Sequence, residues 1–286
     1  MEIFFLSNKN ETLNLLKLPS AEITSISGMG MTKKNFAKNE NPKKDGTEIS
    51  NIKHSERNII FNYVMNGNEN QKTRQLLFSI LGGKESGKII YKDEELKDGI
   101  EIKAYCEDII CEPWTNKVIL SIYFSCPFPF FNSVNKITND IQIIAPLFYF
   151  PLVLKKEGIP VGEIKEASEI ILNNSGQMET PCQIEIKIKG DVVKPIVYDY
   201  TNNKFFGLDE TFKSGQTIFI DTTFGNKSVY LIDVDGTEKD LFYSIKNGSE
   251  FLQIEKGDNT FFVSAESGNE FLKTIFNFNT LYFGVD

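Results

Sequence analysis

Alternation of apolar and polar side chains marks one strand near the middle of the chain. In residues 117–126, KVILSIYFSC, apolar side chains occupy every second position from Val118 to Cys126. Because side chains of a β-strand point to opposite faces in turn, this pattern predicts a half-buried strand. Pro127 and Pro129 end it, since neither can donate a ladder hydrogen bond. We take this proline-punctuated exit as the end of a first domain.

Before the exit, the pattern predicts strands and one helix. Residues 57–65 and 101–110 alternate as strands do. Residues 69–81 place Leu76, Leu77 and Ile80 on one helical stripe, and the glycine pair that follows ends the helix. Shorter strands are expected at 2–6, 13–18 and 88–91. Residues 27–51 are rich in Gly, Lys and Asn, so we expect a long exposed loop there.

After about residue 135 the chain has the pattern of β-structure almost throughout. Ile184, Ile186 and Ile188 give the cleanest alternation. Turn signals such as Asp235-Gly236 and Asn247-Gly248 separate short strands about ten residues apart, as in hairpins. This spacing predicts an antiparallel sandwich or jelly roll. The other expected strands are 168–172, 196–200, 204–208, 217–222, 228–231 and 261–264.

Length and charge support two domains. A chain of 286 residues exceeds the usual size of one domain, so we expect residues 1–135 and 136–286 to fold separately. Residues 1–135 hold 17 basic and 17 acidic side chains, so the net charge of −8 lies entirely in the second half. An acidic chain without a basic surface argues against nucleic acid as a partner.

No stretch predicts a membrane partner. The apolar stretch 141–154 is too short to cross a bilayer and contains two prolines. The amino terminus lacks the basic region of a signal peptide. We therefore expect a chain that is made in the cytosol and has no membrane segment.

Candidate catalytic and metal-binding residues are few. A Ser-His-Asp triad could use only His54, and no serine stands in a G-x-S-x-G motif. The four cysteines include no C-x-x-C pair, so we expect free thiols rather than a zinc site. Asp233-Val-Asp235-Gly236 begins like a calcium loop, but Ser244 stands where the bidentate Glu belongs, which favours a hairpin turn. We expect no enzyme activity, no catalytic residue, no metal and no cofactor.

Two other functions stay open on the residues alone. A saccharide-binding module needs an aromatic platform, and the second half has no Trp. Its tyrosines could serve, although in a sandwich they more often pack; they are Tyr198, Tyr200, Tyr230, Tyr243 and Tyr282. A sandwich-fold glycosidase would need paired carboxylates, and nothing in the sequence singles out a pair.

The order of several segments resembles the distal tail protein (Dit-like) family of long-tailed phages. In the first half the resemblance rests on Asp45-Gly46, Arg57-Asn-Ile59, the helix 69–81 and the exit Phe124–Phe131. In the second half it rests on Asn174-Ser-Gly176, Pro181 and the strand 184–188, then Phe206–Leu208, Gly215–Asp221, Lys227–Val229, Phe251-Leu252 and Lys256–Asn259. The resemblance covers nearly the whole chain.

The resemblance implies a mainly β fold with an N-terminal split β-barrel-like domain carrying one helix and a C-terminal galectin-like antiparallel β-sandwich. It implies a non-catalytic baseplate hub subunit that forms a hexameric ring. The ring would join the tail tube protein to the tail-associated lysin, tail fibre or receptor-binding protein, in a virion or phage-tail-like particle assembled in the host bacterial cytoplasm.

The chain departs from the family pattern at two places. Phe128 stands where many members have an acidic residue before the second proline. The second half lacks the His and Trp with which galectins bind sugar, so the resemblance supplies no ligand-binding residue. A carbohydrate partner therefore has no support from the family pattern.

Overall fold

The computed structural model describes residues 1–40, 45–65, 70–112, 118–141, 145–146, 162–163 and 169–285. Most of the apolar stretch 141–154 and the turn expected at 66–68 lie outside these residues. The chain divides into two compact units, which are described separately. The first comprises Met1–Asn135 and Leu281–Asp286, and the second comprises Lys136–Thr280.

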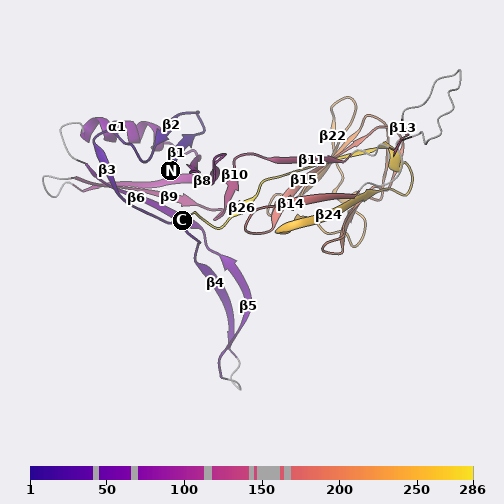
Figure 1. Cartoon of the computed structure of the whole chain (residues 1–286), viewed down its shortest axis with the longest axis horizontal. Helices are drawn as coiled ribbons and strands as arrows, with labels where there is room; N and C mark the ends of the chain where they lie inside the picture. Colours follow the sequence, from indigo (N-terminus) through magenta and orange to yellow (C-terminus); the bar gives the residue numbers. More distant parts are fainter. Residues whose placement is uncertain are drawn as a thin grey trace. The chain divides into compact units, whose positions relative to one another are not determined.

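The first unit is built on one antiparallel sheet in the order β2-β1-β7-β8-β9-β6-β3, with β10 and β26 attached (Figure 1). Its strands are β1 (Glu2–Ser7), β2 (Thr12–Asn14), β3 (Ala21–Ser27), β6 (Arg57–Met65), β7 (Gly87–Lys92), β8 (Ile100–Glu112), β9 (Val118–Cys126), β10 (Phe131–Ser133) and β26 (Leu281–Tyr282). The predicted central strand is β9, which pairs with β6 on one side and β8 on the other. Across the described residues the strands do not close into a barrel.

One face of this sheet is covered by the predicted helix, α1 (Asn70–Leu81). Leu77 and Leu81 are buried in the core of the unit, while Leu76 and Ile80 pack at its margin. Thr73 donates a 2.5 Å hydrogen bond to the carbonyl of Pro19, which ties the helix to the chain that leads into β3. The inward positions of β6 and β9 supply most of the remaining core.

The segment 27–51 is not the loop that its composition suggests. Lys34–Glu40 and Thr47–His54 form β4 and β5, an antiparallel hairpin that projects from the first unit (Figure 1). Every side chain of β4 and β5 is exposed except that of His54. The prediction of exposure was therefore confirmed, whereas the prediction of irregular structure was wrong.

The end of the chain returns to the first unit, so the expected second domain, 136–286, ends early. Leu281 and Tyr282 in β26 pair with β10. The Val285 amide then donates to the Met29 carbonyl at 2.9 Å. Gly284 passes so close to Met29 and Gly30 that a Cβ there would lie 2.5 Å from main-chain atoms. These backbone contacts join segments 250 residues apart and leave no local sequence pattern.

The second unit is the predicted antiparallel sandwich. One sheet has the order β11-β25-β15-β20-β21-β22, with β23 paired to β15, and the other has the order β14-β24-β17-β18. The first contains β11 (Ile137–Ile141), β15 (Thr180–Ile188), β20 (Thr217–Asp221), β21 (Ser228–Ile232), β22 (Glu238–Asp240), β23 (Gln253–Ile254) and β25 (Leu272–Phe278). The second contains β14 (Glu169–Asn174), β17 (Ile196–Asp199), β18 (Lys204–Gly207) and β24 (Gly257–Ser264).

Short strand pairs and single turns complete this unit. Ala145–Pro146 (β12) pairs with Gly162–Glu163 (β13), and Val192–Val193 (β16) with Thr211–Phe212 (β19). Two short 3₁₀ turns span Phe242–Ser244 and Asn269–Phe271. Within the described residues, no helix is long and apolar enough to cross a membrane.

The predicted alternation of β15 is confirmed, because Ile184, Ile186 and Ile188 all face the core between the two sheets. The sequence pattern did not predict β25, which pairs with β15 along seven residues. The buried Phe276 of β25 contacts the buried Phe261 of β24, with ring centroids 5.1 Å apart. This contact joins the two layers.

Candidate interaction surfaces

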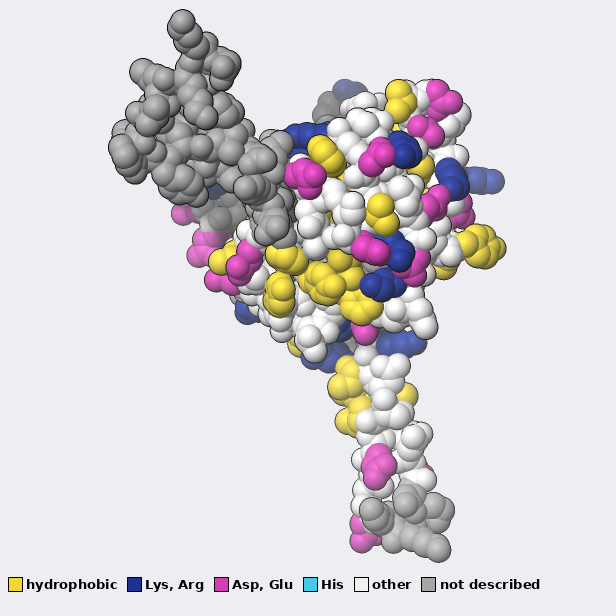
Figure 2. Space-filling model, turned by 90° about the vertical axis from the view of Figure 1, so that its right-hand side faces the viewer, with side chains coloured by type: hydrophobic (Ala, Val, Ile, Leu, Met, Phe, Trp, Pro, Cys, Tyr) yellow, Lys and Arg dark blue, Asp and Glu magenta, His cyan; other side chains and the backbone are white. Residues whose placement is uncertain are grey.

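The β4–β5 hairpin presents an apolar face without a covering layer in the described chain. Phe36 lies directly opposite Ile52, and Lys38 lies opposite Ile49. The register shifts between Ala37 and Lys38, so β5 contains one extra residue and Ile49 returns to the face of Ile52. Phe36, Ile49 and Ile52 are each about half exposed. Figure 2 shows hydrophobic side chains along the hairpin near the body of the unit.

At the base of the hairpin, His54 is held by aromatic rings. Its imidazole lies 5.1 Å from the ring of Phe130 and 5.4 Å from the ring of Phe283. The Nδ1 atom is 2.9 Å from the Thr32 hydroxyl. Burial, followed by the nearby positive charges of Lys34 and Arg57, lowers the pKa of His54. A neutral imidazole that packs between rings is a structural element of the hairpin base and has no partner for catalysis.

Arg57 fixes the same region from inside. It is 1% exposed, and its guanidinium lies 4.7 Å from the centroid of the Phe131 ring. It donates four hydrogen bonds, all to main-chain carbonyls: Pro129 at 2.8 Å, Gly28 at 2.5 Å, Gly30 at 2.6 Å, and Phe283. Burial lowers the pKa of Arg57. This arginine joins β6, the proline exit and the end of the chain.

The second unit carries an aromatic row on the outer face of the β14-β24-β17-β18 sheet. Cross-strand pairing places Glu169, Phe262, Tyr198 and Phe205 in one line across the four strands. Tyr198 and Tyr200 are two residues apart, so they share this face. Their rings are 6.4 Å apart and inclined by 27°. The Phe262 ring lies 6.2 Å from Tyr198 and 5.9 Å from Tyr200. We call these residues the aromatic platform.

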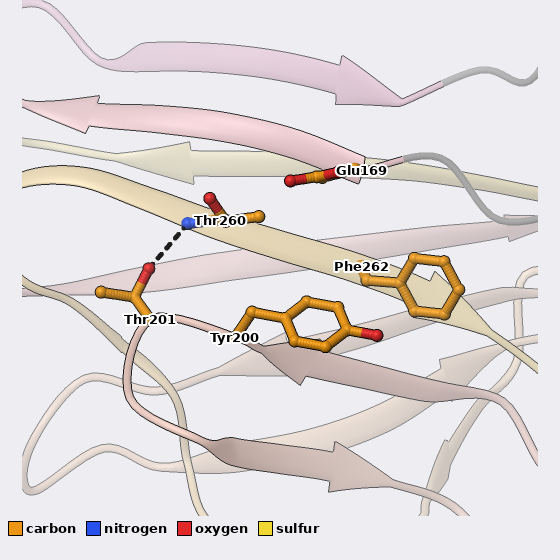
Figure 3. Close-up of a pocket in the computed structure, with 5 residues that line it drawn as sticks. All are labelled: Glu169, Tyr200, Thr201, Thr260 and Phe262. Carbon is orange, nitrogen blue, oxygen red and sulfur yellow. Dashed lines mark hydrogen bonds between the residues drawn. The ribbon is translucent and has the colours of Figure 1, made fainter.

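An open hollow of about 530 Å³ lies on the platform. Its walls are Glu169, Tyr200, Thr201, Thr260 and Phe262. Figure 3 shows the Tyr200 ring extending toward Phe262 and the Glu169 carboxylate pointing along the sheet toward Thr260. The Thr201 hydroxyl accepts a 2.9 Å hydrogen bond from the Thr260 amide, which fixes the turn after β17. The hollow thus combines ring faces with hydroxyl and carboxylate groups.

The structure separates the tyrosines that the sequence suggested as a platform. Tyr198 and Tyr200 come together, but Tyr230 stacks on Phe219 in the other sheet, with centroids 5.2 Å apart. Tyr243 stands alone and is 99% exposed, and Tyr282 belongs to the first unit. The sequence analysis missed Phe262 and Phe205, although both alternate with buried phenylalanines in their strands.

The remaining candidates have structural roles. Asp233–Gly236 is a turn between β21 and β22, closed by a 2.9 Å hydrogen bond from the Gly236 amide to the Asp233 carbonyl. The four cysteines are free. Burial raises the pKa of Cys182 and of Cys126 to about 12, which keeps both as unreactive thiols. Within the described residues, no three His, Cys, Asp or Glu side chains gather as metal ligands do.

Comparison with known proteins agrees with this architecture. Residues 175–279 match the family model described as the C-terminal domain of the siphovirus-type tail component. The chain is a Dit-like phage tail protein. The matched residues form most of the sandwich, from the end of β14 to the end of β25, and they include most of the aromatic platform. Comparison with curated protein sequences finds no match.

Solved structures extend the likeness in fold to both units. The Dit protein (gp 19.1) of phage SPP1, described as a paradigm of the hub adsorption apparatus in phages that infect Gram-positive bacteria, superimposes with a TM-score of 0.68. The identity is 12%, over 98% of each chain. A chain of the phage P2 baseplate in its activated conformation with calcium gives 0.50 at 11% identity, over 98% of this chain and 97% of that one.

Proposed function

We propose that this chain is a subunit of a baseplate hub that assembles as a hexameric ring at the end of a phage tail. The ring joins the tail tube to the tail-tip lysin, fibre or receptor-binding proteins, and the chain acts as an adaptor without catalysis. It is part of the virion and assembles in the cytoplasm of the host bacterium. The observation that carries this proposal is the likeness in fold to SPP1 Dit across nearly all of both chains.

The hairpin supports self-association. A two-stranded hairpin alone is only marginally stable in water, because it buries little apolar surface. The face formed by Phe36, Ile49 and Ile52 therefore gains stability when it packs on another surface. A ring of identical subunits needs two complementary patches per copy, and a projecting hairpin supplies one that can reach a neighbour.

Charge distribution is consistent with a ring formed by the first unit. Residues 1–135 carry equal numbers of basic and acidic side chains, so copies of this unit approach one another without net repulsion. The net charge of −8 lies in residues 136–286. Like charge on these residues disfavours contact between copies of the second unit and keeps it soluble.

The test is the mass of the purified chain by light scattering, with negative-stain images of the same peak. We expect six copies and a ring with a central channel. A triple variant, Phe36→Ser, Ile49→Ser and Ile52→Ser, should lose the ring, because it removes the apolar face of the hairpin. Val234→Ser is the matched control, since Val234 is 73% exposed on a turn of the second unit.

Two results would contradict parts of the proposal. A triple variant that still forms rings would exclude the hairpin as the contact between subunits. A wild-type chain that stays monomeric at high concentration, with and without its tail tube protein, would exclude the hexameric ring. Circular dichroism of each variant checks that a loss of mass is not a loss of fold.

A further inference from the structure

We propose that the aromatic platform of the second unit is a saccharide-binding site for an uncharged, pyranose-containing oligosaccharide. The platform is formed by Tyr198, Tyr200, Phe205 and Phe262, with Glu169, Thr201 and Thr260 at the hollow. This site is independent of the ring, because every one of these residues belongs to the second unit.

Ring geometry is the first argument. One face of a pyranose ring presents several C–H bonds, and these match the negative face of an aromatic ring. Tyr200 is 61% exposed, and Tyr198 and Phe262 are half-buried, so their rings offer faces to solvent while their edges are anchored. The 6.4 Å between the Tyr198 and Tyr200 centroids is comparable with the length of one pyranose residue.

Polar groups at the hollow are the second argument. A binding site for a polyhydroxylated ligand needs a few hydrogen-bonding groups beside apolar walls. The Glu169 carboxylate accepts hydrogen bonds, and the hydroxyls of Tyr200, Thr201 and Thr260 can donate or accept them. The hollow of about 530 Å³ lies within the usual range for small-molecule sites.

Charge decides against nucleic acid bases, which also stack on aromatic rings. A stacking platform for single-stranded nucleic acid requires a positively charged groove along it. Residues 136–286 carry the whole net charge of −8, and the hollow itself contains Glu169 and no basic side chain. A polyanion is repelled, whereas an uncharged sugar is not.

The width of the platform decides against a protein partner. A stable protein interface buries about 800 Å² on each side and draws on roughly 20 to 30 residues. Here the exposed apolar side chains form a narrow band across four strands. The band is bordered by the hydrogen-bonded pair Asn173–Asp258, whose Nδ2 and Oδ1 atoms are 2.6 Å apart. A narrow aromatic band with polar borders suits a short sugar chain.

The experiment is isothermal titration of the full chain with soluble tetrasaccharides of glucose and of N-acetylglucosamine, in α- and β-linked forms. We expect at least one to bind with a dissociation constant in the micromolar to millimolar range. Tyr200→Ala should weaken that binding by about tenfold or more, since it removes the most exposed ring of the platform. Tyr243→Ala is the matched control and should bind like the wild type, because Tyr243 is exposed elsewhere on the same unit.

Further arms separate the alternatives. Glu169→Gln should weaken binding less than Tyr200→Ala, because an amide keeps one acceptor for sugar hydroxyls. Three outcomes would overturn the proposal: no binding of any tetrasaccharide at 10 mM (about the practical limit for weak ligands), equal binding by Tyr200→Ala and wild type, or equal losses in Tyr200→Ala and Tyr243→Ala. A photo-crosslinker at position 200 that captures a virion protein in the assembled tail would instead assign the platform to a protein partner. Light scattering of the same variants shows whether the ring is intact, so failure of the hub proposal is visible separately.

Discussion

Replacing Arg57 by Met tests how the first unit holds the end of the chain. The change keeps a side chain of similar length but removes the guanidinium, which donates to Pro129, Gly28, Gly30 and Phe283. Each carbonyl left without a donor costs about 1 kcal/mol, the low end of the usual range, because three of the four bonds are only part-buried. Four such losses amount to about 4 kcal/mol.

Part of this cost is offset, because the variant no longer buries a positive charge. The native arginine is desolvated, as its lowered pKa indicates, and a buried charge carries a penalty that an apolar side chain avoids. We therefore expect the first unit to lose about 2–3 kcal/mol of unfolding free energy. For a unit of this size, each kcal/mol lowers the melting temperature by about 2–4 °C, so the shift is roughly 5–10 °C.

Differential scanning calorimetry measures the shift, and hydrogen exchange shows where the structure loosens. The amides of residues 281–285 should exchange faster in Arg57→Met, while those of β15 in the second unit should not change. Lys103→Met is the control, since it removes one positive charge from the exposed side of the neighbouring strand β8. If both variants melt at the same temperature, the four hydrogen bonds do not hold the chain end as argued.

Three further predictions concern single side chains. Gly284→Ala should lower the melting temperature of the first unit, because the new Cβ would lie 2.5 Å from Met29 and Gly30 backbone atoms; calorimetry with Gly225→Ala, in open space but at positive φ, separates this clash from backbone strain. The pKa of His54 is lowered in the native chain, so its contribution to stability is complete above about pH 6.5 and declines as the pH falls below that; urea titrations between pH 7 and 5 should show a smaller slope in His54→Gln, and equal slopes would refute this. The thiol of Cys182, with a pKa raised to about 12, should react with N-ethylmaleimide only when the chain unfolds, and rapid labelling of the native protein would contradict its burial.

The sequence predicted the strands whose two faces differ. In β6, β9 and β15, apolar side chains occupy alternate positions because one face lies on a core and the other on solvent. The β4–β5 hairpin escaped because both of its faces are exposed, so no alternation marks it. Its strands are held by main-chain hydrogen bonds, which any sequence without proline can make.

The residues that join distant segments were harder to predict. Arg57 has the same parity as the buried Ile59 and Phe61, which was the one local sign of its inward position. Its acceptors at Gly28, Pro129 and Phe283 could not be known before the fold was. The aromatic platform was half visible, because Tyr198 and Tyr200 share a face by spacing alone. Phe262 joins them only through the pairing of β17 with β24.

The second unit is inserted within the first, since β10 leads out to it and β26 leads back. These two strands pair with each other, and at the near end of the sandwich β11 pairs with β25 in the same way. A pull on the second unit therefore divides between two covalent crossings, and a single protease cut in either crossing leaves the units tethered. Because entry and exit lie side by side, another domain with neighbouring ends could replace the sandwich without rebuilding the first unit.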